Sequence, residues 1–160
     1  MQKIKVYIMS IAIALAVGGL SALLTKDSMD IYGSIVKPPL SPPAIVFPIV
    51  WTILFILMGI SSAIIYLKGK ANSDVNIADA MFLYILNLIV NFSWSIIFFN
   101  FRMFLLSFIC IIILWLIIIA MIVAFGKVSK LSAYLQIPYL LWVTFAGYLN
   151  LAIYLLNNRI

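Results

Sequence analysis

The chain has 160 residues, of which 67% are hydrophobic and only 9% are charged, and its mean hydropathy is +1.27. A soluble domain of this size cannot bury so much apolar surface, which excludes an ordinary soluble globular protein as well as a disordered or collagen-like chain. The net charge of +6 comes from Lys and Arg residues that stand singly or in pairs between apolar runs, a pattern typical of membrane proteins rather than nucleic-acid-binding proteins.

Residue types that support much enzyme chemistry are missing. The chain has no His and no Glu, and Cys110 is its single cysteine. A structural zinc site, which needs about four nitrogen or sulfur ligands, is therefore excluded. A disulfide within the chain and a His-activated Ser or Cys nucleophile are excluded as well. We accordingly expect no metal, no intrinsic cofactor and no nucleic-acid partner.

Five apolar runs follow one another along the chain, and each exceeds the roughly 20 residues that cross a bilayer. Their approximate limits are 4–25, 42–67, 77–99, 103–125 and 131–156. Runs such as 109–119 lack the alternating polarity of a membrane β-strand. The sequence thus predicts an all-α membrane protein, a five-transmembrane-helix bundle in the lipid bilayer, with residues 1–160 forming a single domain.

The connections between these runs differ in length. The segment 26–41 is the one long loop, whereas 100–102 is a tight turn that makes the third and fourth helices an antiparallel hairpin. Ser41, followed by Pro42 and Pro43, predicts the start of the second helix, because Ser caps a helix N-terminus and Pro suits the first helical position.

The N-terminus carries Lys3 and Lys5 before the first apolar run, as a secretory signal peptide does. The run is about 20 residues long, more than the usual 7–15, and no convincing cleavage site follows it, so we interpret it as a transmembrane helix. Lys and Arg residues number six on the N-terminal side of the membrane and four on the other. The positive-inside rule then favours a cell-membrane protein whose N-terminus is cytoplasmic and whose long loop lies outside.

Small residues recur at every fourth position of the first helix, at Ser10, Ala14, Gly18 and Ala22. Such a ridge lets another helix backbone approach closely. We interpret it first as internal helix packing, and the alternatives are a dimer face or one wall of a ligand cavity.

Two prolines and an absence of charge characterise the helix interiors. Pro48 removes a backbone hydrogen bond just past the predicted first turn of the second helix and should bend that helix, and Pro138 should kink the fifth near one end. No ionisable side chain falls at mid-membrane, where ion-coupled transporters place theirs. A pump that works alone is therefore not expected, which leaves binding, sequestration or passive passage.

Three helices carry aromatic or amide side chains at helical spacing. The stripes comprise Phe47, Trp51 and Phe55 in the second helix, Asn87, Asn91, Trp94 and Phe98 in the third, and Tyr139, Trp142, Ala146 and Asn150 in the fifth. Polar groups in lipid point inward, so these faces should converge on a pocket for a large, flat, apolar ligand such as a planar macrocycle or a sterol. For any single Trp the alternative is packing. A purely structural role stays open for Asn91 and Asn150, whereas we assign Asn87 to the cavity.

These residues resemble the signature of the TspO/MBR family, which includes the translocator proteins, or peripheral-type benzodiazepine receptors, and the tryptophan-rich sensory proteins. The second helix and its preceding loop carry the first part of the likeness, in Tyr32, Lys37-Pro38, Ser41-Pro42-Pro43, Phe47-Pro48, Trp51-Thr52, Phe55 and Met58-Gly59. The remainder is Asn87, Asn91-Phe92, Trp94 and Phe98-Phe99 in the third helix, and Pro138-Tyr139-Leu140, Trp142-Val143, Ala146 and Leu149-Asn150 in the fifth. The likeness spans nearly the whole chain. The abundance of Lys and Ile suggests a bacterial member.

The resemblance implies a homodimer that binds protoporphyrin-like tetrapyrroles, as ligand or substrate, and synthetic ligands of the isoquinoline carboxamide and benzodiazepine types. The pocket it implies lies under the first loop, and the candidate ligand-binding residues are Tyr32, Pro42, Phe47, Trp51, Phe55, Asn87, Trp94, Tyr139, Trp142 and Ala146. The family also includes members that promote light-dependent breakdown of protoporphyrin, a role that would fall here to Trp51 and Trp142. Conventional enzyme action is not expected. The competing hypotheses are a membrane sensor or scaffold that acts through partner proteins and a passive small-molecule transporter.

Overall fold

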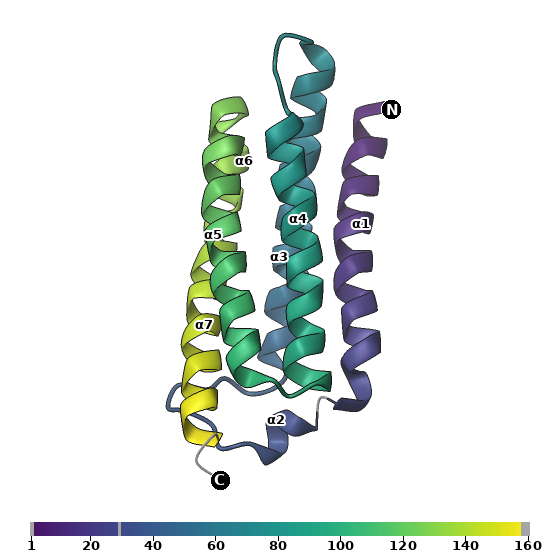
Figure 1. Cartoon of the computed structure of the whole chain (residues 1–160). Coiled ribbons are helices and arrows are strands. Elements are labelled where there is room, and N and C mark those ends of the chain that lie inside the picture. Colours follow the sequence, from purple (N-terminus) through teal and green to yellow (C-terminus); the bar gives the residue numbers. More distant parts are fainter. Residues whose placement is uncertain (1, 29, 158–160) are drawn as a thin grey trace.

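The computed structural model describes residues 2–28 and 30–157, and within them five helical segments are long and apolar enough to span a membrane (Figure 1). The first four are α1 (Gln2–Thr25), α3 (Val46–Ala71), α4 (Ala78–Ser95) continued by the π-helical turn η2 (Ile96–Asn100), and α5 (Phe104–Val128). The fifth consists of α6 (Lys130–Leu135) and α7 (Ile137–Asn157). The predicted all-α, five-span fold is confirmed.

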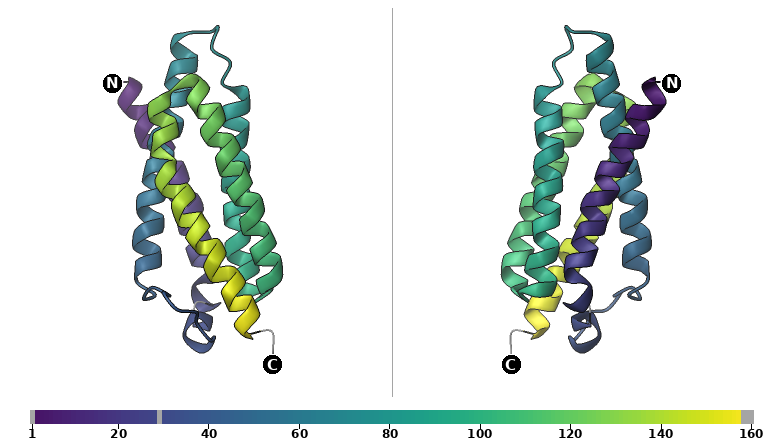
Figure 2. Two further views of the ribbon diagram at one scale, coloured as in Figure 1. Left: turned by 90° about the vertical axis from the view of Figure 1, so that its left-hand side faces the viewer. Right: turned by 90° about the vertical axis from the view of Figure 1, so that its right-hand side faces the viewer.

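The helices run up and down as a bundle, with the N-terminus at one end and the end of α7 at the other (Figures 1 and 2). The α3–α4 connection lies at the N-terminal end, and the long α1–α3 connection crosses the opposite end. This connection holds the 3₁₀ turn η1 (Lys26–Ser28) and the short helix α2 (Ile31–Ser34). α4 and α5, which follow one another in the sequence, form the predicted antiparallel hairpin. Arg102, in the turn between them, adopts a left-handed conformation with φ 55°.

The start of the second span differs from the prediction. The helix begins at Val46, and its capping position makes no side-chain hydrogen bond, while the Ser41 hydroxyl instead donates to the carbonyl of Pro38 at 2.7 Å. The physical reason is that a proline disfavours helical conformation in the residue before it, so consecutive prolines postpone the helix. Pro48 therefore falls in the first helical turn, where its missing N–H costs nothing, and the bend predicted from an interior proline loses its basis.

The fifth span is interrupted near its start, as Pro138 predicts. Regular helix stops at Leu135 and resumes at Ile137, and the intervening Gln136 donates its backbone N–H to the carbonyl of Ala133 at 3.1 Å. A proline cannot donate to the carbonyl four residues earlier, which explains a break in this turn.

The small-residue stripe of α1 packs against α3. Ala14 is fully buried, and a Cβ atom on Gly59 of α3 would lie 2.5 Å from the backbone Cα of Ile11. A Cβ on Gly18 would overlap the ring of Phe55. Small residues thus let these two helices approach backbone to backbone, which is how helices associate where lipid removes the hydrophobic driving force. The internal-packing interpretation of the stripe is confirmed for Ala14 and Gly18.

Replacing Gly59 by alanine should lower the thermal midpoint of the detergent-solubilised protein by roughly 5 °C, because the added methyl group forces α1 away from α3. Gly19→Ala is the matched control, since a Cβ at Gly19 meets no atom within 4 Å. Equal midpoints for the two variants would show that the backbone contact contributes nothing to stability.

Candidate functional site

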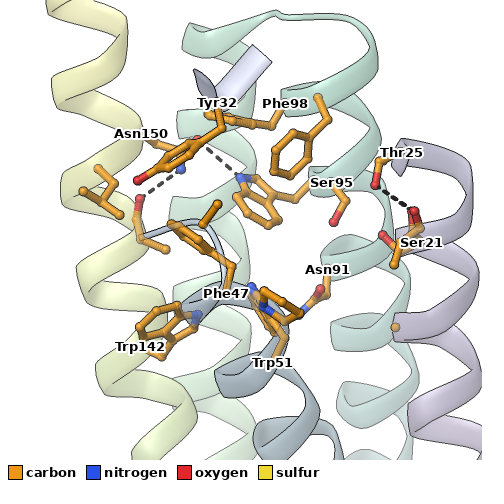
Figure 3. Close-up of a pocket in the computed structure, with 18 of the residues that line it drawn as sticks. Ser21, Thr25, Tyr32, Phe47, Trp51, Asn91, Ser95, Phe98, Trp142 and Asn150 are labelled. Carbon is orange, nitrogen blue, oxygen red and sulfur yellow. Dashed lines mark hydrogen bonds between the residues drawn. The ribbon is translucent and has the colours of Figure 1, made fainter. Parts of the chain in front are cut away.

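A cavity of about 190 Å³ opens between α1, α3, α4, η2 and α7, at the end of the bundle that the α1–α3 connection crosses (Figure 3). Its wall is mostly aromatic and aliphatic with a few neutral polar groups. It is lined by Gly18, Ser21, Ala22, Thr25, Tyr32, Ala44, Phe47, Pro48, Trp51, Phe55, Asn91, Trp94, Ser95, Phe98, Phe99, Trp142, Ala146, Leu149, Asn150 and Ile153. Three of the four tryptophans of the chain therefore face one space.

Trp51 stands at the centre of the aromatic wall. Its ring centroid lies 5.8 Å from Phe55, 6.0 Å from Trp94 and 6.1 Å from Tyr139. These separations are those of favourable offset and edge-to-face aromatic pairs. Neighbouring rings therefore restrict Trp51 and make it a preformed flat surface for a ligand.

Asn150 ties the inner wall together. Its side-chain oxygen accepts hydrogen bonds from Trp94 Nε1 at 3.3 Å and from Ser107 Oγ at 2.8 Å, and its amide nitrogen donates to the carbonyl of Ala146 at 2.9 Å (Figure 3). One amide thus joins α4, α5 and α7 and fixes the orientation of the Trp94 indole. Buried amides in lipid need such partners, so Asn150 serves both as interhelical bond and as cavity wall.

The floor of the cavity is a chain of hydrogen bonds. Asn91 donates to the Tyr139 hydroxyl at 2.7 Å, and that hydroxyl donates to Asn87 Oδ1 at 2.8 Å. Asn91 lines the cavity, whereas Asn87 and Tyr139 are fully buried beneath it. The two buried residues hold the floor and the edge of Trp51 in place.

Trp142 offers a free donor. Its Nε1 atom is buried and meets no hydrogen-bond partner in the described part of the chain, although the residue lines the cavity and packs edge-on against Phe47 at 5.9 Å. An indole N–H usually finds an acceptor when it is buried. The Trp142 N–H is therefore available to an acceptor on a molecule in the cavity.

The α1–α3 connection closes over the cavity through Tyr32. The Tyr32 ring packs edge-on against Phe47 at 5.2 Å, and its hydroxyl donates to the carbonyl of Pro42 at 3.0 Å. Burial raises the pKa of Tyr32, and the nearby Ser41 hydroxyl acts weakly in the opposite sense, so the phenol keeps its proton at physiological pH and remains a donor. The Lys37 ammonium lies 4.9 Å from the centre of the same ring, which places a cation beside the cavity entrance.

Two side chains of α7 hold this connection. Val36 donates its backbone N–H to Asn157 Oδ1 at 2.9 Å and accepts from Asn157 Nδ2 at 3.0 Å. The Tyr148 hydroxyl donates to the carbonyl of Pro39 at 2.9 Å. A few exposed hydrogen bonds therefore decide how tightly the cover is held.

Asn157→Ala should accelerate both binding and release of a cavity ligand, by roughly fivefold each, because two exposed hydrogen bonds worth ~0.5–1.5 kcal/mol apiece no longer hold the cover. Stopped-flow quenching of tryptophan fluorescence measures both rates. The control is Asn72→Ala, a residue at the opposite end of the bundle. Unchanged rates in Asn157→Ala would mean that the connection does not gate access.

The structure brings together seven of the ten candidate ligand-binding residues. Those that line the cavity are Tyr32, Phe47, Trp51, Phe55, Trp94, Trp142 and Ala146. Three others lie outside the lining: Asn87 and Tyr139 beneath the floor, and Pro42 in the connection, where its carbonyl accepts from Tyr32. Asn87 shares its helix face with Asn91 but lies one turn further from the cavity, so it supports the floor rather than lining it, and its part in ligand binding stays a prediction.

Two sets of lining residues escaped the sequence reasoning. Ser21 and Thr25 extend the small-residue stripe of α1 to the cavity, and the Thr25 hydroxyl donates back to the Ser21 carbonyl at 2.9 Å. The continued small and polar spacing was a usable signal, and it favours the cavity-wall alternative for this end of the stripe. Ser95 and Phe99 enter the wall around η2, and a π-helical turn leaves no comparable trace in hydropathy.

The wall of the cavity offers mostly ring faces and a few neutral polar groups to a ligand. Around the cavity there are rings, hydroxyls and amides, and across the described ranges no three His, Cys, Asp or Glu side chains cluster as metal ligands do. Flat, mostly apolar molecules with a few acceptors suit such a surface.

The amino-acid sequence of the chain is similar to those of known proteins. Residues 10–156 match the model of the TspO/MBR family. The chain is 40% identical to the tryptophan-rich protein TspO of Chlorobaculum tepidum over 148 residues, 92% of each chain. It is 38% identical to the tryptophan-rich protein TspO of Archaeoglobus fulgidus, covering 92% of this chain and 94% of that one. It is 31% identical to the translocator protein of Bos taurus, covering 83% and 79%.

Proposed function

The chain belongs to the TspO/MBR family, a family of multi-pass membrane proteins, and from that premise we propose that its cavity binds a tetrapyrrole such as protoporphyrin. The observation that carries the proposal is the set of three tryptophans, Trp51, Trp94 and Trp142, around one apolar space. A planar macrocycle offers two large π faces to such rings and polar edges to the free Trp142 donor. Flat synthetic ligands of the isoquinoline carboxamide and benzodiazepine types should compete for the same surface.

The size of the cavity defines how binding proceeds. Its volume of about 190 Å³ is below the ~300–1,000 Å³ of typical drug-sized ligand sites. A macrocycle therefore needs part of the wall to move, and the part that we propose moves is the α1–α3 connection, which exposed hydrogen bonds join to Asn157 and Tyr148. Binding accordingly includes an opening step.

Light-driven breakdown of the bound tetrapyrrole is the reaction that the wall supports best. An excited porphyrin can take an electron from an indole in contact with it and pass that electron to dioxygen, which becomes superoxide. The oxidised indole then recovers an electron from the macrocycle, so the porphyrin is the species oxidised and dioxygen is the oxidant that attacks it. Trp51 and Trp142, on facing helices of the cavity, are the proposed donors. This chemistry requires no metal and no ionised nucleophile. Sequestration and passage across the membrane use the same binding step and differ only in the fate of the bound ligand.

The experiment that tests the proposal is a titration of the detergent-purified protein with protoporphyrin in the dark, followed by illumination. Quenching of tryptophan fluorescence should saturate at micromolar ligand and should affect most of the signal, since three of the four tryptophans line the cavity. Linear quenching without saturation would mean partition of the ligand into detergent and would refute specific binding. A light-driven spectral change in the saturated complex then distinguishes a degrader from a carrier.

The Lys37 ammonium should form an ion pair with a carboxylate group of the ligand. Lys37→Gln is expected to weaken protoporphyrin binding about threefold, equivalent to ~0.7 kcal/mol, as befits an exposed ion pair. The same substitution should leave binding of the uncharged dimethyl ester unchanged, which makes the ester the matched control. Equal weakening for both ligands would mean that Lys37 acts through its packing on Tyr32.

We further propose that the protein lies in the cell membrane as a homodimer with a cytoplasmic N-terminus. The excess of Lys residues at the N-terminal end of the bundle supports this orientation. The cavity and the α1–α3 connection then face the outer half of the bilayer. A reporter enzyme fused to either terminus measures the orientation, and a dimer contact outside the α1–α3 packing should appear by crosslinking in liposomes.

A further inference from the structure

The bundle interior on the far side of the cavity floor contains a second group of polar side chains. α4 and α7 run in the same direction, and Asn87 and Tyr139 pair across them at 2.8 Å (Figure 1). Tyr84 precedes Asn87 by three residues, and Gln136 precedes Tyr139 by three, so these two side chains lie at one height in the bundle. Both point inward, because Gln136 is 0% exposed and Tyr84 5%.

α3 supplies a third polar side chain at this height. Met58 of α3 contacts Asn87 through its sulfur at 3.6 Å, and α3 runs opposite to α4, so the next turn of each helix brings Ser62 to the level of Tyr84. Ser62 donates its own proton to the Gly59 carbonyl at 3.0 Å and keeps an oxygen lone pair.

The polar atoms at this level lack partners. Gln136 Nε2, Gln136 Oε1 and the Tyr84 hydroxyl are buried without a hydrogen bond to any residue of 2–28 or 30–157. Leaving a complete amide unpaired in a membrane interior costs much more than a typical hydrogen bond gains. By contrast the neighbouring polar side chains are bonded: Ser61 and Ser132 exchange hydrogen bonds at 2.9 and 3.2 Å, and Asn87 is bonded to Tyr139.

We propose that Gln136 and Tyr84 bind an ordered water molecule, which forms a buried hydration site beneath the floor of the cavity. The site offers a donor, an acceptor and a hydroxyl that serves as either, and buried waters need two to four such groups. The water satisfies the amide that the helix break places in the interior, since Gln136 is the residue between α6 and α7.

The two side chains are coupled through the water, which a double-mutant cycle measures. Gln136→Met and Tyr84→Phe each keep the side-chain volume and remove the polar atoms. Each should lower the thermal midpoint by roughly 3 °C, and the double variant should fall little further, because the first substitution already releases the water. A midpoint raised by Gln136→Met would overturn the proposal, because removing an amide that has no hydrogen-bond partner stabilises the protein. Strictly additive losses would overturn it as well, because they would mean that the two side chains are not coupled.

A second measurement detects the water itself in the unmodified protein. X-ray radiolysis generates hydroxyl radicals from bound water, so Tyr84 should be oxidised in the wild-type protein despite its burial, and the oxidation should fall severalfold in Gln136→Met. Phe125, which is 0% exposed, is the control residue and should stay unmodified. An unmodified Tyr84 in the wild-type protein would refute the site. Neither measurement needs a tetrapyrrole, so their outcome is independent of the proposed function.

Discussion

Replacing Trp51 and Trp142 together by phenylalanine should slow the light-driven loss of bound protoporphyrin about tenfold, which corresponds to ~1.4 kcal/mol in the apparent barrier. Phenylalanine keeps an aromatic face for the macrocycle but is far harder to oxidise than an indole. Binding in the dark should weaken by roughly two- to twelvefold, since the lost contacts are worth ~0.5–1.5 kcal/mol in total. Absorbance decay under constant illumination, at saturating ligand, measures the effect.

Trp115→Phe is the control for this experiment. Trp115 is the fourth tryptophan of the chain; it lies outside the cavity, and its Nε1 donates to the Thr144 hydroxyl at 2.9 Å. Its loss should leave the decay unchanged. Equal decay in the wild type and the double variant would eliminate the two tryptophans as electron donors, and Trp94, the remaining indole of the wall, would then be tested in the same way.

Gly18→Leu should abolish most of the tetrapyrrole binding, with a loss of about 100-fold, or ~2.8 kcal/mol. Gly18 forms part of the cavity wall, and even a single Cβ there overlaps the Phe55 ring. A leucine side chain therefore either occupies the cavity or drives Phe55 into it. Fluorescence titration measures the affinity, and thermal unfolding verifies that the variant is folded.

Gly19→Leu is the matched substitution, one residue along the same helix. A Cβ at Gly19 meets nothing within 4 Å, so this variant should bind as the wild type does. Retained affinity in a folded Gly18→Leu variant would show that the ligand binds elsewhere. The proposal for the cavity would then be withdrawn while the fold assignment stands.

The fold of this protein can be predicted from its sequence because a lipid bilayer allows few kinds of membrane-spanning segment. A span must be long, apolar and helical, so five uninterrupted runs were enough to predict five helices. The same reasoning failed at the start of α3. There the preference of Ser41 for a helix cap competes with the proline sequence behind it, and local backbone sterics decide in favour of a turn.

The sequence predicted which helix faces meet at the candidate site, but it did not predict how far along the helices the cavity extends. Helical periodicity tells which face of a helix a residue occupies, and Trp51, Trp94 and Trp142 do share one space. It does not tell at what height along the axis a cavity ends. Asn87 and Asn91 occupy one face, and a single turn separates a floor-supporting residue from a lining one. That height is set by the packing between helices. The residues of one stripe carry no information about this packing.

The π-helical turn η2 has a consequence for insertions and deletions. It is closed by the bond from the Phe101 N–H to the Ile96 carbonyl, five residues earlier, so it holds one residue more than an α-helical turn. Deleting one residue from Ile96–Asn100 would close this turn as a regular α-helical turn and so change the directions of the side chains within it. Phe98 and Phe99 would then leave the cavity wall. Length variation among relatives should therefore spare this turn, although it ends in a surface hairpin where gaps are ordinarily tolerated.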